Sequence, residues 1–148
     1  MKTYSIDDVS AISSHYLKEG RKQESWEIQS IEIDHRVLRA RITMTSLYVS
    51  GTDSGFHLTI FSTLEFVSQL MIIYAHDWAG LPKKVREGWM VESTTRAVRQ
   101  IRNPDDIRVE MNVRQMRKHG EHLICIADFR VSDDADGLFE ISLKGFLS

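Results

Sequence analysis

The stretch STLEFVSQLMIIYAHDW, residues 62–78, decides the fold. It opens with Ser62 and Glu65 in the S-x-x-E arrangement, in which the two side chains cap backbone amides at the start of a helix. The residues that follow are apolar on nearly every face of that helix. A helix that is apolar all round must be buried all round. In a chain of 148 residues, a sheet wrapped around the helix achieves this burial.

The segments around this helix read mostly as strands. Residues 5–20 predict a short amphipathic helix, because Ser5 precedes acidic residues and apolar residues recur at helical spacing as far as Gly20. Alternating residues predict strands at 26–34 and 37–49, and glycine and polar residues predict a loop at 50–55. Four more strands are predicted at residues 88–99, 107–116, 123–131 and 138–147.

The predicted order is therefore a helix, two strands, a buried helix and four strands. Short loops between consecutive strands favour an antiparallel meander. This is the order of the hotdog fold, an α+β architecture in which a curved antiparallel sheet wraps around a long central helix. We expect a single hotdog domain over residues 1–148. Such domains usually pair, so we expect a homodimer or a dimer of dimers with acyl sites between subunits.

Composition and charge exclude several classes of function. Hydrophobic residues make up 42% and charged residues 27%, as in ordinary soluble proteins. A formal net charge of -2 gives no reason to expect nucleic acid as a partner. The sequence has no secretory signal and no apolar run long enough for a bilayer, so we expect a cytoplasmic protein without membrane insertion. Cys125 is the single cysteine and lies in an apolar run, which predicts a buried thiol. We expect no metal site and no cofactor, since the histidines lack ligand spacing.

Several short pieces of the sequence carry a family resemblance in their order and spacing. They are His15-Tyr16, Ser46-Leu47-Tyr48-Val49-Ser50, Gly55-Phe56-His57, Ser68-Gln69-Leu70, Glu87-Gly88-Trp89 and Arg99-Gln100-Ile101-Arg102-Asn103-Pro104. Over most of its length the chain resembles the FcoT-like long-chain fatty acyl thioesterases, which are hotdog proteins. The resemblance implies hydrolysis of medium- or long-chain fatty acyl groups from coenzyme A or acyl carrier protein.

In that family two tyrosines and a helix asparagine form the polar set around the thioester. The resemblance places the tyrosines at Tyr16 and Tyr48. It places the asparagine position at Ser68 when Ser68-Gln69-Leu70 is matched with N-Q-L, whereas a second register moves that position to Met71. The chain departs from asparagine in both registers. Relatives that act on unsaturated acyl groups of carrier proteins leave amine addition before hydrolysis as an open alternative.

Thioester cleavage requires polarisation of the carbonyl oxygen and delivery of water. Amides at the start of the central helix, around Thr63, Leu64 and Glu65, are predicted to bind the oxyanion with help from the helix dipole. Tyr48 and Tyr16 are candidate donors to the same oxygen, although packing explains half-buried tyrosines as well. Glu65 is the candidate general base, although helix capping alone also accounts for it.

The central helix is also similar to that of the hydroxyacyl carrier-protein dehydratases, whose E-x-x-x-Q pattern matches Glu65-Phe66-Val67-Ser68-Gln69. His57 lies in the loop before the helix, where a dehydratase holds its catalytic histidine, although the proline-rich segment that usually follows in dehydratases is missing and an ordinary loop histidine is the preferred interpretation. Dehydration of 3-hydroxyacyl thioesters by His57 and Glu65 is therefore the alternative activity. The non-enzymatic alternative is a hotdog domain that only binds acyl groups or another protein.

Apolar residues of the central helix are expected to line an acyl tunnel against the sheet, although core packing explains them too. They are Phe61, Leu64, Met71 and Tyr74. Arg99 and Arg102 are the candidates for binding coenzyme A phosphates or an acidic carrier protein, because guanidinium groups suit phosphate. We expect His76 at the surface and a hairpin turn, rather than a calcium loop, at residues 133–137.

Overall fold

The computed structural model describes residues 1–49 and 55–148. Its elements are α1 (Ile6–Ile12), a π-helical turn η1 (Tyr16–Gly20), α2 (Arg21–Gln23), β1 (Ser25–Asp34), β2 (Val37–Ser46), α3 (Ile60–Trp78), β3 (Gly88–Arg99), β4 (Ile107–His119), β5 (His122–Ser132) and β6 (Leu138–Leu147). Every predicted strand is present, although β2 ends three residues earlier than expected and β4 runs three residues further. The predicted loop at 50–55 lies, except for Gly55, outside the described residues.

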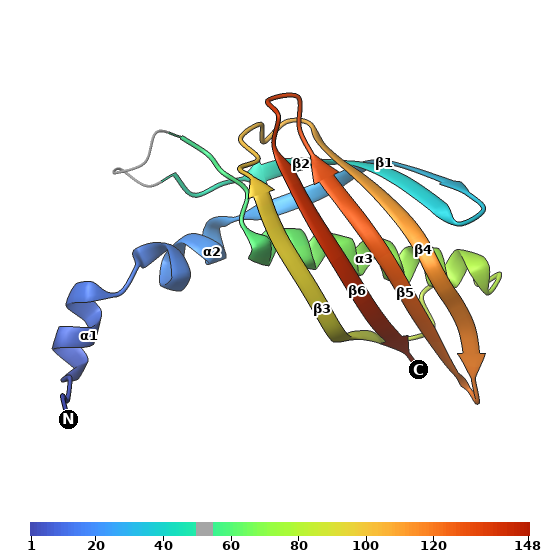
Figure 1. Cartoon of the computed structure of the whole chain (residues 1–148), viewed down its shortest axis with the longest axis horizontal. Helices are drawn as coiled ribbons and strands as arrows, with labels where there is room; N and C mark the ends of the chain where they lie inside the picture. The colour runs from blue at the N-terminus through green and yellow to red at the C-terminus, as the bar shows by residue number, and fades with distance from the viewer. Residues whose placement is uncertain (50–54) are drawn as a thin grey trace.

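The six strands form one antiparallel sheet in the order β1-β2-β4-β5-β6-β3 (Figure 1). Strands β4, β5 and β6 follow one another as the predicted meander requires. Strand β3 instead pairs with β6 and lies at the edge of the sheet. Because β2 and β5 flank β4 on its two sides, β3 cannot pair with β4, and it pairs with the free side of β6 instead. The predicted meander is therefore right for β4 to β6 and wrong for β3.

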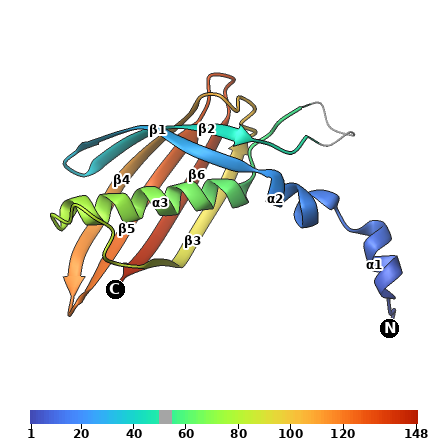
Figure 2. The ribbon, with the colours of Figure 1, turned by 180° about the vertical axis from the view of Figure 1, so that it is seen from behind.

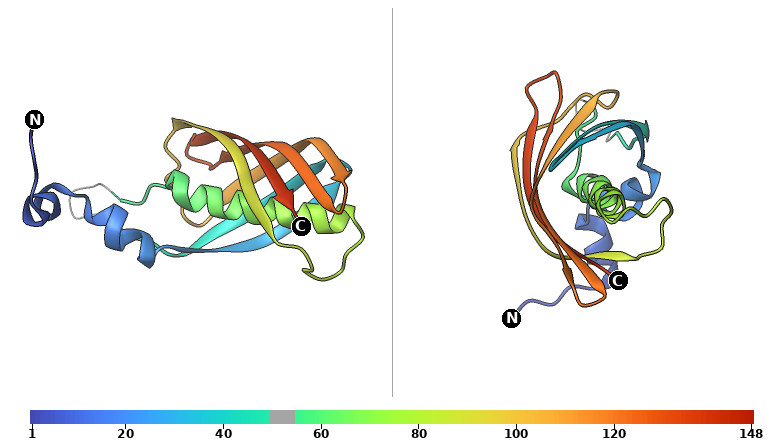
Figure 3. Two further views of the ribbon diagram at one scale, coloured as in Figure 1. Left: turned by 90° about the horizontal axis from the view of Figure 1, so that it is seen from below. Right: turned by 90° about the vertical axis from the view of Figure 1, so that its right-hand side faces the viewer.

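The sheet curves around α3, which lies against its concave face (Figures 1, 2 and 3). Alternate strand residues point towards the helix and are buried, as Leu38, Met111 and Phe129 illustrate. The helix adds Phe66 and Leu70 to the same core. Burial of such a side chain contributes about 1.5–3 kcal/mol relative to exposure, so these contacts hold the helix in the sheet. The predicted α+β architecture, a curved antiparallel sheet around a long central helix, is confirmed.

Burial of α3 within the single chain is one-sided, and the face left exposed is the one that a second subunit is expected to cover. The sheet covers its inner side, whereas Phe61, Glu65, Gln69, Asp77 and Trp78 are exposed on the outer side. The reason is that a single curved sheet encloses only part of a helix, as the view along α3 shows (Figure 3). Within the described residues no helix has the length and apolarity needed to cross a membrane.

The start of α3 also differs from the prediction. The N-cap is Thr59, whose backbone is extended and whose hydroxyl accepts the amide of Ser62 at 3.2 Å. The backbone amide of Leu58 donates to the carbonyl of Ile101 at 2.8 Å, which holds the segment before the cap extended and lets the helix begin at once. The predicted capping box of Ser62 and Glu65 is therefore wrong.

The amino-terminal segment is not one helix. Ser5 and Asp8 form a capping box at the start of α1, as the cap prediction requires, but the helix ends at Ile12. The hydroxyl of Ser13 donates to the carbonyl of Val9 at 2.6 Å, and serine side chains of this kind compete with the helical backbone pattern. All of α1 is exposed, and it projects away from the sheet (Figures 1 and 2).

Candidate active site

Polar side chains from three parts of the chain meet at the amino-terminal end of α3. Glu24, which precedes β1, is half-buried there. Its Oε2 atom accepts a hydrogen bond from the Tyr16 hydroxyl at 3.0 Å and a second from the Ser62 hydroxyl at 2.6 Å. Tyr16 belongs to η1 and Ser62 to the first turn of α3. One carboxylate thus joins the amino-terminal segment to the central helix.

The two tyrosines that the family resemblance singles out lie side by side here. The ring centroids of Tyr16 and Tyr48 are 5.6 Å apart, with the rings tilted by 49°. Gly20 makes this packing feasible, because a Cβ atom there would lie 2.8 Å from the Tyr48 ring and 2.9 Å from the Tyr16 ring. We call Tyr16, Glu24, Tyr48 and Ser62 the tyrosine cluster.

The two tyrosine hydroxyls differ in what they can offer a substrate. Burial raises the pKa of Tyr16, a hydrogen bond with Thr59 opposes this, and the charge of Glu24 raises the pKa further. Tyr16 therefore stays protonated, and it donates its one proton to Glu24. The hydroxyl of Tyr48 has no hydrogen-bond partner in the part of the chain that the structure describes. Tyr48 is the tyrosine that is free to donate.

The amides predicted to bind the oxyanion are already engaged. The amide of Thr63 donates to the carbonyl of Thr59 at 3.1 Å, and its hydroxyl donates to the same oxygen at 2.6 Å. Leu64 follows in the helix interior. Because α3 begins at Ile60, the free amides of its first turn are those of Ile60 and Phe61. The prediction of an oxyanion site at residues 63–65 is therefore wrong, since it relied on the misplaced cap.

A cavity of about 210 Å³ lies between α3 and the edge formed by β3 and β6. Its lining is mainly apolar and includes Ser68, Met71, Ile72, Met90, Leu143 and Gly145. Two glycines keep it open. A Cβ atom on Gly145 would lie 2.5 Å from the sulfur of Met71, and one on Gly88 would lie 3.0 Å from Ile72. Both residues that compete for the family's asparagine position, Ser68 and Met71, therefore lie on this cavity.

The other residues predicted to line the acyl tunnel lie elsewhere. Phe61 is 42% exposed and carries the guanidinium of Arg21 over its ring, 4.5 Å from the centroid. Leu64 is half-buried against the core. Tyr74 is buried, and its hydroxyl donates to the carbonyl of His35 at 3.1 Å. Of the four predicted lining residues, Met71 is the one on the cavity.

The two residues predicted for dehydration, His57 and Glu65, lie before α3 and on its outer side. Glu65 is exposed on the outer side of α3 and has no hydrogen bond or ion pair within residues 1–49 and 55–148. His57 is half-buried in the segment between Gly55 and α3. The outer side of α3 is the side expected to face a second subunit, so the roles predicted for Glu65 and His57 stay predictions.

The candidate phosphate ligands lie over the turn between β5 and β6. Arg99 donates through Nε to the carbonyl of Asp136 at 2.7 Å and forms an ion pair with its carboxylate at 3.3 Å. Arg102 donates to the side chain of Gln100 at 2.6 Å. Both guanidinium groups thus hold loop atoms, and a phosphate has to compete with these contacts.

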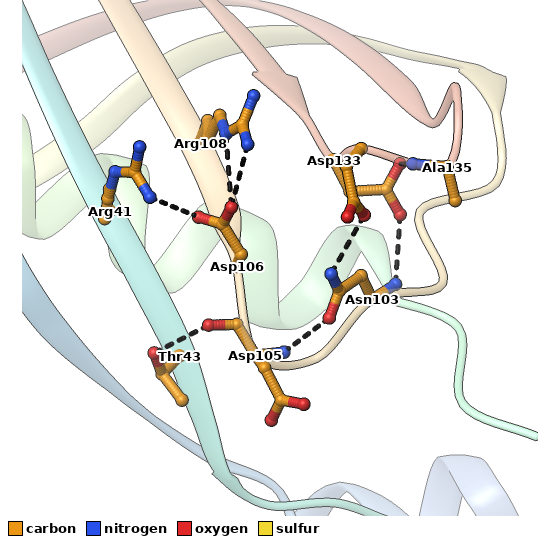
Figure 4. A network of polar contacts seen from close by, with 9 residues as sticks. Arg41, Thr43, Asn103, Asp105, Asp106, Arg108, Asp133 and Ala135 are labelled. Carbon is orange, nitrogen blue, oxygen red and sulfur yellow. Dashed lines mark hydrogen bonds and ion pairs between the residues drawn. The ribbon is translucent and has the colours of Figure 1, made fainter.

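The same turn is organised by Asp133, which is buried (Figure 4). Its carboxylate accepts the backbone amides of Arg102 at 2.7 Å and Asn103 at 3.0 Å, and also those of Ala135 and Gly137. Burial alone would raise the pKa of Asp133, but these four bonds together lower it below the usual value. The segment at 133–137 is a turn between two strands, as predicted.

A second group of contacts in Figure 4 fixes the connection between β3 and β4. The carboxylate of Asp106 pairs with Arg41 at 3.2 Å and with Arg108 at 2.9 Å. The hydroxyl of Thr43 donates to the carbonyl of Asp105 at 3.2 Å. This connection also supports the segment before α3 through the Leu58 amide, so it positions the end of α3 where the tyrosine cluster lies.

His76 is buried, so the expectation that it lies at the surface is wrong. Its Nε2 atom accepts the amide of Val85 at 3.3 Å, which places the ring proton on Nδ1, 2.8 Å from the carbonyl of Ile72. Both ring nitrogens are bonded, and the histidine fastens the segment after α3 to the helix. Its role is structural.

Cys125 is buried, as predicted, and burial raises the pKa of its thiol to about 12. The thiolate form needed for nucleophilic attack is therefore scarce at neutral pH. Within the described part of the chain, no group of histidine, cysteine, aspartate and glutamate side chains is arranged to hold a metal ion.

Glu24 was not among the candidates from sequence. It stands in the polar run Arg21-Lys22-Gln23-Glu24-Ser25, and its partner Ser62 follows 38 positions later. No spacing motif joins residues that far apart. The one feature of the sequence that points to Glu24 is that it is a charged residue directly before an alternating strand.

Comparison with known proteins agrees with the architecture. No protein-family model and no curated protein matches the sequence. Solved structures do match. A hypothetical thioesterase with coenzyme A from Streptococcus pneumoniae has a TM-score of 0.54 at 10% identity over 84% of this chain and 86% of its own. A mutant thioesterase from Pseudomonas aeruginosa has a TM-score of 0.54 at 14% identity over 99% and 95%.

The chain has the hotdog fold. A thioesterase from Haemophilus influenzae extends the agreement, with a TM-score of 0.52 at 8% identity over 99% of this chain and 92% of its own. Identities this low support a shared fold and leave the activity to be argued from the site. In this hotdog protein the candidate site consists of the tyrosine cluster and the cavity beside Ser68.

Proposed function

We propose that the protein hydrolyses medium- or long-chain fatty acyl thioesters of coenzyme A or acyl carrier protein at the tyrosine cluster. The observation that carries the proposal is the packing of Tyr48 against Tyr16 at the amino-terminal end of α3, with the Tyr48 hydroxyl free to donate. These are the two tyrosines that the resemblance to FcoT-like thioesterases assigns to the thioester. The hotdog fold shared with solved thioesterases adds support.

In this proposal Tyr48 polarises the thioester. Its hydroxyl donates a hydrogen bond to the carbonyl oxygen, and the bond strengthens as that oxygen becomes negative in the tetrahedral intermediate. The positive end of the α3 dipole and the free amides of Ile60 and Phe61 favour the same negative charge. Tyr16 does not donate to the carbonyl oxygen, because its hydroxyl donates its proton to Glu24.

The acyl chain occupies the cavity between α3 and β6. Residues 62 and 72 are ten positions apart on α3, so roughly 15 Å of helix separates the tyrosine cluster from the deeper cavity wall. A medium-length acyl chain spans that distance in an extended form. We assign Ser68 and Met71 to acyl binding, since both line the cavity.

We further propose that two copies pair along β3. This twelve-residue strand is an edge of the sheet, and Trp89, Met90 and Val91 are exposed on it. A long edge strand with apolar side chains invites pairing with another strand, and a second copy would also cover the exposed side of α3. Light scattering after size-exclusion chromatography tests this, with a dimer mass expected for the wild type and a monomer mass for Val91→Lys.

The activity is tested by measuring free thiol release from acyl-coenzyme A thioesters of increasing chain length, and from the corresponding acyl carrier proteins. We expect turnover that rises from short to medium or long chains. Enoyl absorbance from a 3-hydroxyacyl thioester without thiol release would favour the dehydratase alternative. Saturable acyl binding without either product would favour a binding domain.

A further inference from the structure

We infer that Glu24 is the general base that activates water for thioester hydrolysis, an inference that rests on the proposed function. Glu24 enters neither the family resemblance nor the sequence candidates. It is the carboxylate of the tyrosine cluster, and it accepts hydrogen bonds from Tyr16 and Ser62.

The two hydrogen bonds orient this carboxylate in a particular way. Both donors, the hydroxyls of Tyr16 and Ser62, bind the same oxygen, Oε2. The other oxygen, Oε1, has no hydrogen-bond partner among the residues that the structure describes. A carboxylate has about four lone-pair sites, so Oε1 is left to accept a proton from water. In this arrangement Oε2 fixes the orientation of the carboxylate, and Oε1 is the oxygen that acts as the base.

The surroundings of Glu24 suit this task. Its side chain is half-buried, which limits competing water without closing off the site. It accepts the hydroxyl of Ser62 from the first turn of α3, the end of the helix where the oxyanion is proposed to form. Tyr48, the donor proposed for the carbonyl oxygen, packs on the ring of Tyr16, whose hydroxyl touches Glu24. Tyr16 therefore contacts both the proposed base, Glu24, and the proposed oxyanion donor, Tyr48.

The step balances without a further reactant. Glu24 takes a proton from water through Oε1 as the water oxygen bonds to the carbonyl carbon, and the carbonyl electron pair moves to the oxygen that Tyr48 stabilises. The carbonyl bond then forms again, the carbon–sulfur bond breaks, and sulfur leaves with the bonding pair. The thiolate takes the proton from Glu24. The products are the fatty acid and the free thiol, and Glu24 is again a carboxylate.

The test is Glu24→Gln in the full-length protein, assayed for thiol release with the acyl-coenzyme A that the wild type hydrolyses fastest. Glutamine has the same shape and keeps an oxygen that accepts from Tyr16 and Ser62, but it cannot take a proton. We expect kcat to fall by about 10²–10⁴-fold, the usual contribution of a general base, with a much smaller change in KM. Glu27→Gln, an exposed position on β1, is the matched control and should keep the wild-type kcat.

Glu24→Asp keeps the inference testable if the glutamine variant folds poorly. For a base, kcat per folded molecule should decrease in the order Glu, Asp, Gln, because aspartate retains a carboxylate at a longer reach. For a residue that merely joins the two segments, glutamine should match the wild type and aspartate should be worse; that order overturns the inference. A wild-type protein that releases no thiol from any acyl thioester overturns the proposed function itself and the inference with it.

Discussion

The hydroxyl of Ser62 donates a hydrogen bond of 2.6 Å to Oε2 of Glu24, which bonds the first turn of α3 to the residue that precedes β1. Tyr16 donates to the same oxygen. The carboxylate of Glu24 therefore helps to fix the position of the amino-terminal segment relative to the central helix, together with the stacking of Arg21 on Phe61. Any change at this junction should affect both stability and the geometry of the tyrosine cluster.

Ser62→Ala should lower the free energy of unfolding by about 1–2 kcal/mol, because it removes a hydrogen bond to a carboxylate in a partly buried place. Thr59→Ala should lower it by about 1 kcal/mol through loss of the helix cap, and Thr59→Ser should restore most of that. Denaturant titration measures both. An unchanged stability in Ser62→Ala would mean that the junction with Glu24 is not formed in solution.

Tyr48→Phe should lower kcat by about 10²-fold, the usual effect of losing one donor to an oxyanion, with a melting temperature within a few degrees of the wild type. The small thermal effect follows because the Tyr48 hydroxyl has no partner among the described residues. Tyr16→Phe, by contrast, should destabilise the protein, since it removes the bond to Glu24. Steady-state kinetics and thermal melts of the two variants test these expectations. If both variants lose the same factor in kcat and have the same melting temperature, Tyr48 and Tyr16 do not have the separate roles proposed here.

Gly145→Val should shorten the acyl chain that the protein accepts. A Cβ atom there already lies 2.5 Å from the sulfur of Met71, so the side chain must displace Met71 or fill the cavity. We expect kcat/KM for long chains to fall at least about tenfold more than for short chains, in keeping with a loss of a few buried methylenes at about 0.8 kcal/mol each. Glu140→Ala on the exposed face of β6 is the control. A uniform loss across chain lengths would place the acyl chain elsewhere.

Asp133→Asn should lower the free energy of unfolding at neutral pH by about 2 kcal/mol, because four backbone amides lose a charged acceptor. The pKa of Asp133 is lowered in the folded protein, so its contribution is present above the unfolded value of about 3.9 and is lost as the pH falls through the lower folded value. Stability measured from pH 7 down to acid should therefore fall more steeply in the wild type than in the variant. If stability depends on pH in the same way in the wild type and the variant, the charge of the Asp133 carboxylate does not contribute to the stability of the fold.

The architecture was predictable because it depends on patterns that are local in sequence. Alternation marks β4, β5 and β6, and the apolar run after Phe61 marks α3. Short-range patterns do not reveal which edge a strand joins, and β3 was therefore placed wrongly. The same limit applies to the N-cap, since Thr59 and Ser62 are both good capping residues and a contact from Ile101 selects between the extended and helical conformations before α3.

The candidate site was predictable in part. Tyr16 and Tyr48 came from a family resemblance, and the structure brings them together. Glu24 and the partners of His76 depend on contacts between segments that are distant in the chain or that approach in a loop, such as the amide of Val85. When a polar residue lies in a polar run, the sequence does not show whether that residue has a buried hydrogen-bond partner. Tertiary contacts therefore decide which of several chemically suitable residues belongs to the site.

The central claim is that the thioester is bound and cleaved at the tyrosine cluster. A crystal structure with a non-hydrolysable acyl-coenzyme A analogue tests it most directly. The account predicts the carbonyl oxygen within hydrogen-bonding distance of the Tyr48 hydroxyl, a water on Oε1 of Glu24, and the acyl chain in the cavity beside Met71. A carbonyl group bound away from Tyr48, or an acyl chain outside that cavity, would contradict it.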